Sequence, residues 1–251
     1  MPASKPRYEL YYWPSIQGRG ELVRLIFEAA GEPYVDVARL RSSGAGVPAL
    51  MKVLRESRAK LPFAPPILKV GDLTLSQTGT ICRFLAERFG LVPKDEKLRL
   101  RADALNLTIL DLLTEAHDVH HPLSVALYYE DQKAEARRAS SEFTRHRIPK
   151  FLDYFERVLK QNAAAKKKYL IGEKLSYVDL SMFQLLSGLT YAFPNAMRRI
   201  NRAIPELCSL RDRVAKQPNI LRYLNSPRRI PFNQEGIFRY YPELDEGGQE
   251  K

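Results

Sequence analysis

The stretch YYWPSIQGRGELVRL, residues 11–25, changes from strand-like to helix-like character within a few residues. Aromatic side chains favour a strand over residues 8–13, and the proline and glycines that follow favour a turn. Apolar residues then recur at the spacing of one helix face, at Leu22, Leu25, Ile26 and Ala29. Gly31 stands where a helix commonly ends. The stretch therefore predicts a strand that feeds an amphipathic helix, the opening unit of an α/β fold.

The residues up to 90 continue this α/β pattern. The segment YVDVARL, residues 34–40, predicts a second short strand, and residues 38–60 predict an irregular excursion with one or two helical turns. Two further short strands, PILKV and LTLS, flank Gly71-Asp72. The segment TGTICRFLAERFG, residues 78–90, predicts a helix that stops at its final glycine. The expected order is β-α-β, an irregular loop, and β-β-α.

From residue 98 onward the sequence carries helical spacing alone. Three groups of residues show it: Leu98, Ala102, Leu105 and Leu112; Phe151, Phe155 and Leu159; and Leu180, Phe183 and Leu186. The segment SYVD, residues 176–179, has the form of a helix capping box, and Pro205 and Pro218 mark two later short helices. We expect an α/β domain over residues 1–90, a linker over 91–97, and an all-helical domain with a C-terminal tail over 98–251.

Composition and charge exclude several classes of function. The chain has 251 residues, of which 45% are hydrophobic and 27% charged, as in an ordinary folded protein. The formal net charge is +11, but the basic residues are spread over both halves and no nucleic-acid-binding motif accompanies them. No apolar run approaches the roughly 18 residues of a membrane span, and the first residues lack the apolar core of a secretory signal. Cys82 and Cys208 are too few for a disulfide framework. We expect a cytoplasmic protein that binds neither nucleic acid nor a membrane.

Three segments together resemble the cytosolic glutathione transferases, and the resemblance covers nearly the full length of the chain. They are YYWPSIQGRGELVRL (11–25), APPILKVGDLTLSQTGTI (64–81) and YLIGEKLSYVDLSMF (169–183). The first segment is closest to the tyrosine-type classes pi, mu and sigma, although its turn carries one extra residue. The resemblance implies a thioredoxin-like N-terminal domain that binds glutathione, followed by an all-α domain that holds a hydrophobic substrate.

The resemblance also implies that Tyr12 donates a hydrogen bond to the glutathione thiolate. A hydroxyl at a strand end opposite a helix N-terminus points to a place where backbone N–H groups favour an anion. A thiol held there is more acidic, and its thiolate is the nucleophile. The lengthened turn leaves Tyr11 and Ser15 as alternatives for this role, and a purely structural Tyr12 is a further one. Because neighbouring strand residues face opposite sides, alternation separates the two tyrosines.

The second segment supplies the residues expected to bind glutathione. Pro66 aligns with the cis-proline of the family, and Gln77 follows at the spacing that the family shows. Gln77 and Thr78 are expected at a helix N-terminus, where a hydroxyl and backbone N–H groups can bind the γ-glutamyl carboxylate. The weaker candidates, which fit solvated surface charges as well, are Arg19 after the turn and Arg58 or Lys60 for the glycyl carboxylate.

Three departures from the family pattern predict a site with fewer contacts to glutathione. Pro65 precedes Pro66, so the backbone N–H that normally donates to glutathione is absent. Ala64 replaces a polar residue that is common just upstream. The acidic residue often lent by the neighbouring subunit aligns with Leu107, or with Asn106 after a shift of one residue. We therefore expect weaker glutathione binding than in relatives without a proline at position 65.

The second substrate and the oligomeric state follow from the same resemblance. We expect the hydrophobic-substrate pocket to include Ile16, His117, His121 and Tyr128. Together with His120 these histidines lie about one helical turn apart, but no fourth well-placed ligand accompanies them, so we expect no metal. Phe63 lies in the loop where several classes carry an aromatic residue that enters the partner subunit, which implies a homodimer.

The leading interpretation is a glutathione transferase whose bound thiolate attacks a small hydrophobic electrophile or a peroxide. A protein of the same fold that binds ligands or partners without efficient catalysis is the alternative, and a glutathione-dependent isomerase is a third.

Overall fold

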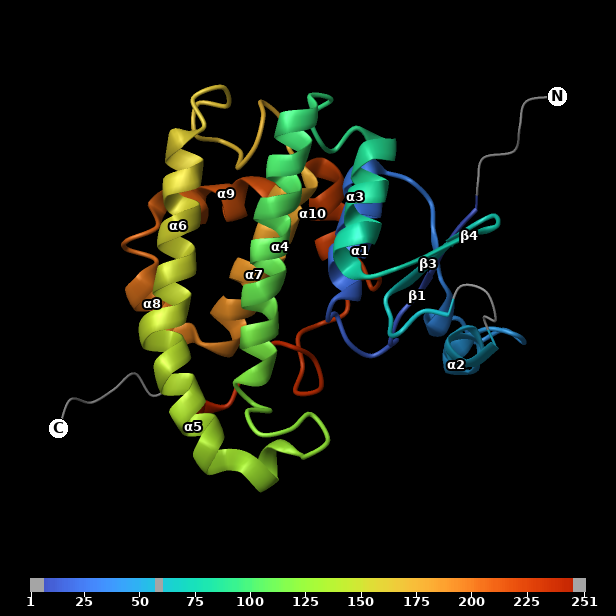
Figure 1. Cartoon of the computed structure of the whole chain (residues 1–251), viewed down its shortest axis with the longest axis horizontal. Helices are drawn as coiled ribbons and strands as arrows, with labels where there is room; N and C mark the ends of the chain where they lie inside the picture. The colour runs from blue at the N-terminus through green and yellow to red at the C-terminus, as the bar shows by residue number, and fades with distance from the viewer. Residues whose placement is uncertain (1–6, 57–60, 246–251) are drawn as a thin grey trace.

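The chain divides into a small sheet with its helices and a tall helical bundle beside it (Figure 1). The structure is a computed structural model and describes residues 7–56 and 61–245. Strands occur only before residue 77 in these ranges, and the described residues after Phe89 are helical or irregular. The expected α/β part followed by an all-helical part is confirmed.

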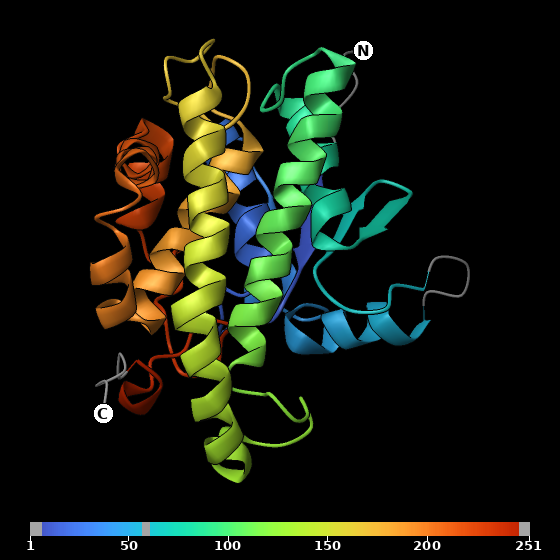
Figure 2. The ribbon, with the colours of Figure 1, turned by 60° about the vertical axis from the view of Figure 1, so that its left-hand side comes forward.

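The sheet has four strands in the order β2-β1-β3-β4. They are β1 (Tyr8–Tyr11), β2 (Val35–Asp36), β3 (Ile67–Val70) and β4 (Leu73–Ser76). β2 is parallel to β1, whereas β3 runs antiparallel to both of its neighbours, β1 and β4. Helices α1 (Gly20–Ala30) and α3 (Thr78–Phe89) lie between the sheet and the bundle, side by side (Figures 1 and 2). The carboxyl end of β1 therefore points towards the start of α1.

Glycines end both of these helices as the sequence predicts. Gly31 follows α1 and Gly90 follows α3, each with φ of 68° in the left-handed region that favours glycine. Their backbone N–H groups bond to carbonyls of the last helical turn. The β3–β4 hairpin turns at Gly71, whose φ is also positive. These local signals fixed the boundaries of the elements around the site.

Three elements of the α/β part differ from the expectation. β1 stops at Tyr11, two residues early, and β2 has two residues before a 3₁₀ turn, η1 (Val37–Arg39), replaces the rest of the expected strand. The segment expected to be irregular contains a full helix, α2 (Gly46–Glu56). Pro48 falls in its first turn, where a missing N–H costs no helical hydrogen bond. Leu50 and Val53 bury one face of this helix against the sheet in a small separate cluster, and this packing stabilises the helix.

The bundle is built from the helices that follow α3 in the described residues (Figures 1 and 2). They are α4 (Glu96–Asp118), α5 (Lys133–Glu142), α6 (Ile148–Gln161), α7 (Tyr177–Ala192), α8 (Pro194–Ile200), α9 (Pro205–Ala215) and α10 (Pro218–Leu224). A π turn, η3 (Phe143–Arg147), joins α5 to α6, and the 3₁₀ turn η2 (Tyr129–Gln132) precedes α5. Pro205 and Pro218 begin α9 and α10, as predicted.

The central helix α7 begins at the expected capping box. The carboxylate of Asp179 accepts hydrogen bonds from the backbone N–H of Ser176 and from the Ser176 hydroxyl, at 2.8 and 2.7 Å. It also accepts one from the backbone N–H of Leu170 at 2.8 Å, which ties the preceding loop to the helix start. Most of α7 is buried, so this cap anchors the middle of the bundle.

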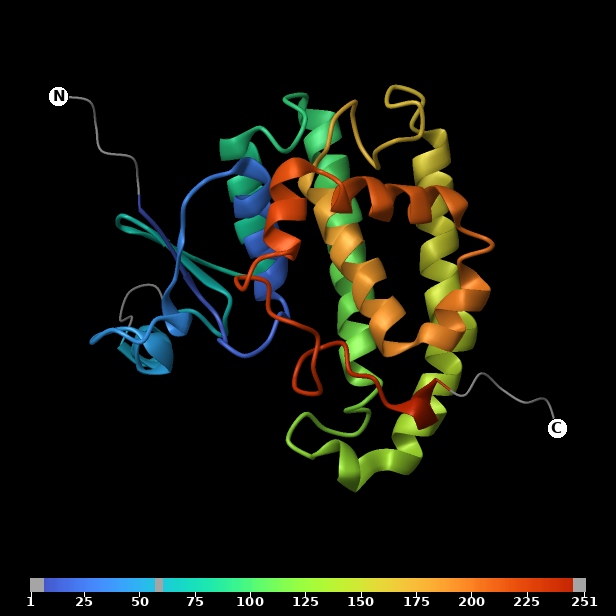
Figure 3. The same cartoon turned by 180° about the vertical axis from the view of Figure 1, so that it is seen from behind.

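Residues 225–245, the C-terminal segment, run back across the molecule from the sheet side to the far end of the bundle (Figure 3). Phe238 lies on α7 at Gly188, and Tyr241 stacks on Tyr129 with ring centroids 3.9 Å apart. The segment contains one 3₁₀ turn, η4 (Pro242–Leu244), and then Asp245 accepts hydrogen bonds from the backbone at the start of α8. It therefore connects both parts of the chain.

Within the described ranges, no helix has both the length and the apolar character that crossing a bilayer requires. Cys82 and Cys208 are free thiols. Cys82 is fully buried in the core, and burial raises the pKa of its thiol to about 12. This thiol is therefore an inert packing group.

Candidate functional site

A cleft of about 440 Å³ opens between the α/β part and α4. Its walls on the α/β side come from the start of α1, the loop before β3 and the start of α3, and its opposite wall comes from α4. The lining residues are Arg19, Phe63, Ala64, Pro65, Pro66, Gln77 and Thr78, and on α4 Leu107, Leu110, Asp111 and Thr114. The fold thus gathers five of the predicted glutathione-binding residues in one place. The other two, Arg58 and Lys60, lie outside the described residues.

The predicted proline and the start of α3 lie on the same side of this cleft. The peptide bond between Pro65 and Pro66 is cis, as the sequence predicts. Gln77 is the N-cap of α3 and has a φ of 69°, a left-handed conformation that residues other than glycine rarely adopt. Thr78 begins the helix and is buried. A strained residue next to unpaired helix N–H groups is typical of a ligand site, and the helix N-terminus favours an anion.

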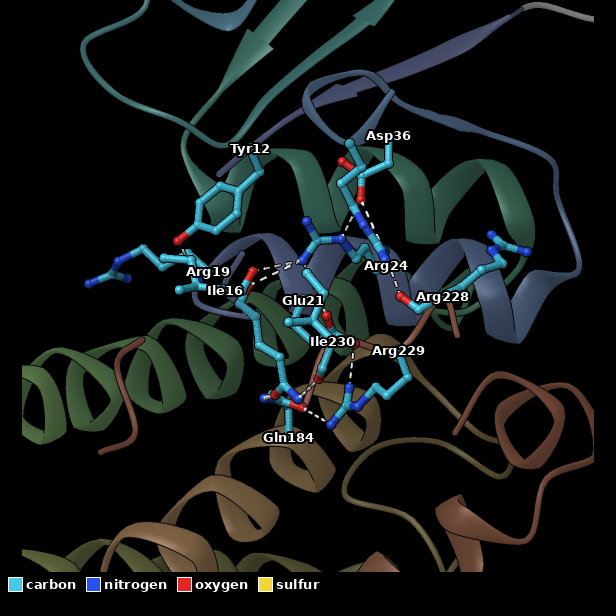
Figure 4. A network of polar contacts seen from close by, with 12 residues as sticks. Tyr12, Ile16, Arg19, Glu21, Arg24, Asp36, Gln184, Arg228, Arg229 and Ile230 are labelled. Atoms are coloured by element: carbon cyan, nitrogen blue, oxygen red, sulfur yellow. Dashed lines mark hydrogen bonds and ion pairs between the residues drawn. The ribbon is translucent and has the colours of Figure 1, made fainter. Parts of the chain in front are cut away.

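Tyr12 lies immediately after β1 and points at the start of α1. Its hydroxyl oxygen accepts a hydrogen bond from the backbone N–H of Arg19 at 2.9 Å (Figure 4). Its ring packs against two glycines, since a Cβ on Gly18 would lie 2.2 Å from the hydroxyl and one on Gly20 would lie 2.5 Å from the ring. The glycines of the turn therefore make room for this side chain.

The chemistry of the Tyr12 hydroxyl follows from these contacts. Burial raises its pKa, and the Arg19 N–H and the cations of Arg24 and Arg19 oppose that rise without cancelling it. The phenol therefore stays protonated at neutral pH. Among the described contacts its oxygen accepts from Arg19 and its proton has no acceptor, so the proton can be donated to a ligand, and the accepted bond strengthens that donation. This is the state required of a donor to an anion.

The alternatives to Tyr12 point elsewhere. Tyr11 faces the opposite side of β1 and donates to Glu9 at 3.0 Å, with its pKa raised to about 12 chiefly by burial. Ser15 donates to the carboxylate of Glu235 in the C-terminal segment at 3.1 Å. Among these three hydroxyl groups, that of Tyr12 is the one placed at the α1 N-terminus.

A buried polar network supports the turn from behind (Figure 4). Arg24, fully buried in α1, pairs with Glu21 at 3.2 Å and with Asp36 at 2.7 Å. Its guanidinium also donates to the carbonyls of Ile16 and Gln17 at 3.4 Å. Glu21 in turn accepts from Tyr223 and Arg229, and Arg229 donates to Gln184 on α7. The network links the turn, α1, α7 and the C-terminal segment.

Sequence reasoning missed this network, although one signal was present. Glu21 and Arg24 are oppositely charged residues three positions apart in a helix face that is otherwise apolar. At this spacing two side chains are neighbours on the helix, so they can form an ion pair. Their distant partners could not be foreseen, because Arg229 lies 208 residues from Glu21 along the chain. Thr114, Leu110 and Asp111 were also missed, because nothing in the helical spacing of α4 shows which turn faces the cleft.

The residues predicted for the hydrophobic-substrate pocket are not among those that line this cleft. Ile16 lies beneath the C-terminal segment, near Gly236. His117 and His121 stack with ring centroids 5.1 Å apart, and His121 contacts the carbonyl of Leu127 at 3.1 Å. Tyr128 is 78% exposed in the loop after α4. The structure brings the two histidines together and leaves Tyr128 in solvent.

His120 is buried beside this pair rather than in a ligand site. Its Nε2 lies 2.9 Å from the carbonyl of Ile237, and burial lowers its pKa to about 3. In residues 7–56 and 61–245, no group of three or more His, Cys, Asp or Glu side chains is arranged to hold a metal ion. The imidazole therefore serves as a neutral donor to the C-terminal segment.

Comparisons with known proteins agree with this geometry. The family described as "Glutathione S-transferase, C-terminal domain" matches residues 117–227. A glutathione S-transferase of Plasmodium falciparum is 27% identical over 222 residues, covering 86% of this chain and 94% of the relative. Glutathione S-transferase A3 of Mus musculus is 29% identical over 245 residues, covering 92% and 94%. The solved structure of prostaglandin synthase D of Nilaparvata lugens has a TM-score of 0.69 at 21% identity and covers 90% of this chain and 100% of its own, which shows a shared fold. These matches show that the chain is similar to glutathione S-transferases along most of its length.

Proposed function

We propose that the protein is a glutathione transferase of the tyrosine type, in which bound glutathione attacks a small hydrophobic electrophile or a peroxide. Relatives named glutathione S-transferases along nearly the whole chain support the transferase activity. The single observation that carries the site is the cleft itself, where the cis Pro65–Pro66 peptide and the N-terminus of α3 converge beside the start of α1. This cleft offers hydrogen-bonding groups of the kind that an extended, anionic tripeptide needs.

Glutathione is proposed to lie along this wall of the cleft. Its γ-glutamyl carboxylate accepts hydrogen bonds from the backbone at Gln77 and Thr78 and from the Thr78 hydroxyl. Its cysteinyl backbone runs past Pro65 and Pro66, where a carbonyl can accept but no N–H can donate. Arg19 supplies a positive charge at the end near α1, and Arg58 or Lys60 remains the proposed partner of the glycyl carboxylate.

Tyr12 is the proposed catalytic residue. Its neutral hydroxyl donates to the sulfur of bound glutathione and stabilises the thiolate, so the thiol loses its proton to water at a lower pH. The thiolate then attacks the electrophilic carbon, a carbon–sulfur bond forms, and the leaving group departs with its electron pair. The tyrosine remains protonated through this step, in agreement with its raised pKa.

The electrophile is proposed to bind on the side of Tyr12 away from α3, between Ile16 and the end of α4 that carries His117 and His121, with Tyr128 in the neighbouring loop.

We further propose a cytoplasmic homodimer with a role in detoxification, in which Phe63 contacts the partner subunit. Phe63 is 95% exposed at the rim of the cleft, so it does not pack within its own domain. The division into residues 1–90, 91–97 and 98–251 stays part of this proposal.

Two assays with the purified protein test the proposal. Calorimetry with glutathione measures binding, and conjugation of glutathione to an aryl halide measures transfer. Binding together with conjugation supports the transferase. Binding without turnover of aryl halides, isothiocyanates, peroxides or isomerisable substrates would contradict it and favour a ligand-binding role, and an absence of binding would contradict the proposed site.

A further inference from the structure

The cleft contains one contact between its two walls that the proposed chemistry has not used. A terminal guanidinium nitrogen of Arg19, at the start of α1, lies 2.6 Å from the hydroxyl oxygen of Thr114 on α4. Both residues line the cleft. The two residues are 95 positions apart in the chain, so the contact exists because the fold brings α4 against the turn.

The hydroxyl of Thr114 is oriented as an acceptor. It donates its own proton to the carbonyl of Leu110, one turn earlier in α4, at 2.9 Å. A threonine hydroxyl has one proton and two acceptor lone pairs, so its oxygen can then only accept from Arg19. A neutral acceptor fixes a guanidinium without neutralising it, whereas a carboxylate would pair with its charge.

The backbone of Arg19 contacts Tyr12, the proposed catalytic residue. Its backbone N–H donates to the Tyr12 hydroxyl, while its side chain extends past that hydroxyl and away from the buried Arg24 network (Figure 4). One residue therefore carries both the donor that holds Tyr12 and a cation at the wall of the cleft. The position of that cation depends on Thr114.

We propose that Thr114 is a positioning residue that holds the Arg19 guanidinium beside the sulfur of bound glutathione, so that the cation helps to keep the thiol ionised. The proposal rests on the proposed transferase function and adds to it a residue of the helical part. Arg19 acts on the thiolate through its charge, and Thr114 acts only through Arg19. The proton leaves the thiol for water, as in the step already described.

The charged and titratable groups around this position make the role of Thr114 specific. On the α/β side, the Tyr12 hydroxyl contacts the Arg19 backbone, and the Arg24 guanidinium carbon lies 5.7 Å from the centre of the Tyr12 ring. Asp111 lines the same cleft from α4, three positions before Thr114, and Glu235 of the C-terminal segment contacts Ser15 in the turn. Without the Thr114 hydroxyl, Arg19 is free to turn towards the Asp111 carboxylate, which would cancel its charge.

The test compares three variants by the pH dependence of conjugation. Thr114→Val keeps the shape of the side chain and removes the acceptor, and Thr114→Ser restores it. Thr108→Val is the matched control, because the Thr108 hydroxyl makes the same bond to the carbonyl four residues earlier, at 2.9 Å, without a partner across the cleft among the described contacts. Thermal unfolding of each variant measures stability separately.

For Thr114→Val we expect the pH midpoint of the rate to rise by about half a unit, with about a threefold lower rate below that midpoint. The absorbance titration of the bound thiolate should shift by the same amount, whereas the KM for glutathione should change less than twofold. Thr114→Ser and Thr108→Val should retain the wild-type midpoint.

An unshifted midpoint in Thr114→Val would overturn the proposal, whether or not the variant is less stable, because a merely structural Thr114 would change stability alone. A shift in Thr114→Ser or in Thr108→Val equal to that in Thr114→Val would overturn it as well. If the wild-type protein itself fails to conjugate glutathione, the transferase function fails, and the thiolate titration of bound glutathione still tests Thr114.

Discussion

Pro65 is a residue at which the proposed glutathione site departs from the pattern of the glutathione transferases. It lines the cleft directly before the cis-proline and has no N–H to donate. We predict that Pro65→Val tightens glutathione binding, because a backbone hydrogen bond contributes about 0.5–1.5 kcal/mol, or about two- to tenfold in affinity. Calorimetry measures this change. Ala64→Val, which adds similar bulk next to an N–H that is already present, is the control and should not tighten binding. Equal or weaker affinity in Pro65→Val would contradict the prediction and mean that the lost N–H is compensated or that glutathione binds elsewhere.

His120 gives the fold a defined sensitivity to acid. Its pKa falls from an ordinary value of 6.5 to about 3 because of burial, so the unfolded chain binds the proton that the folded chain excludes. Above pH 6.5 this group therefore leaves the free energy of unfolding at its full value. As the pH falls from 6.5 towards 3, the free energy of unfolding decreases by up to about 1.4 kcal/mol per pH unit.

We predict that His120→Gln, whose amide can still donate to the carbonyl of Ile237, is less stable at neutral pH but loses less stability on acidification than the wild type. Urea unfolding between pH 4 and 7 measures both slopes. His146→Gln, at an exposed position in the bend between α5 and α6, is the control and should cost less stability at neutral pH than His120→Gln. Parallel curves for His120→Gln and wild type would mean that His120 is already protonated in the folded state.

At the scale of elements, the C-terminal segment depends on the absence of a side chain in α7. A Cβ on Gly188 would lie 2.2 Å from the ring of Phe238. We predict that Gly188→Ala destabilises the protein by about 1–3 kcal/mol through overpacking, although alanine favours a helix over glycine. Phe238→Ala should cost about 3 kcal/mol through the cavity that it leaves.

In the double variant the added methyl group enters that cavity, so the combined loss should be smaller than the sum of the two single losses. Chemical unfolding of the four proteins gives this coupling. Additive losses would show that the C-terminal segment does not pack on α7 at this point in solution.

The elements that sequence reasoning placed well are those defined by local signals. Helices α1 and α3 end at glycines that need positive φ, and the β3–β4 hairpin turns at Gly71, so each boundary is encoded within a few residues. The length of helix α2 was underestimated, as one or two turns, because Gly44, Gly46 and Pro48 look like loop residues, whereas its stability comes from burying Leu50 on the sheet. The path of the C-terminal segment was missed for the same reason, because long-range contacts determine it.

The candidate site divides in the same way. Pro66, Gln77 and Thr78 were predictable because a fixed spacing and a helix start are visible in the sequence. The sequence predicted that the Tyr12 hydroxyl lies at a helix N-terminus. It did not predict which backbone N–H donates to that hydroxyl, and the structure shows that this donor is Arg19. Thr114 and the Glu21 network were not predictable, because their partners come from elements that are distant in the chain.

At the scale of the whole molecule, Phe63 predicts how two copies meet. Phe63 is 95% exposed at the rim of the cleft, in the loop where the resemblance implies an aromatic residue that enters the partner subunit. We predict a dimer at micromolar concentration, which Phe63→Asp weakens at least tenfold by burying a charge without a partner. Sedimentation measures both. Leu123→Asp, at another exposed apolar position, should leave the dimer intact. A monomeric wild type would contradict the dimer, and an unaffected Phe63→Asp dimer would contradict the role of Phe63 alone.

The proposed function as a whole depends on the thiolate that Tyr12 stabilises, and the pH–rate profile of Tyr12→Phe tests it most directly. The substitution removes one oxygen from a side chain whose ring is held by Gly18 and Gly20, so the fold should persist. Tyr11→Phe, on the opposite face of β1, is the matched control. We predict that Tyr12→Phe retains glutathione binding but loses at least tenfold in rate, about 1.4 kcal/mol, with the pH midpoint shifted upward, while Tyr11→Phe stays close to the wild type. Full activity of Tyr12→Phe with an unshifted profile would contradict the assignment of Tyr12 as the residue that activates glutathione.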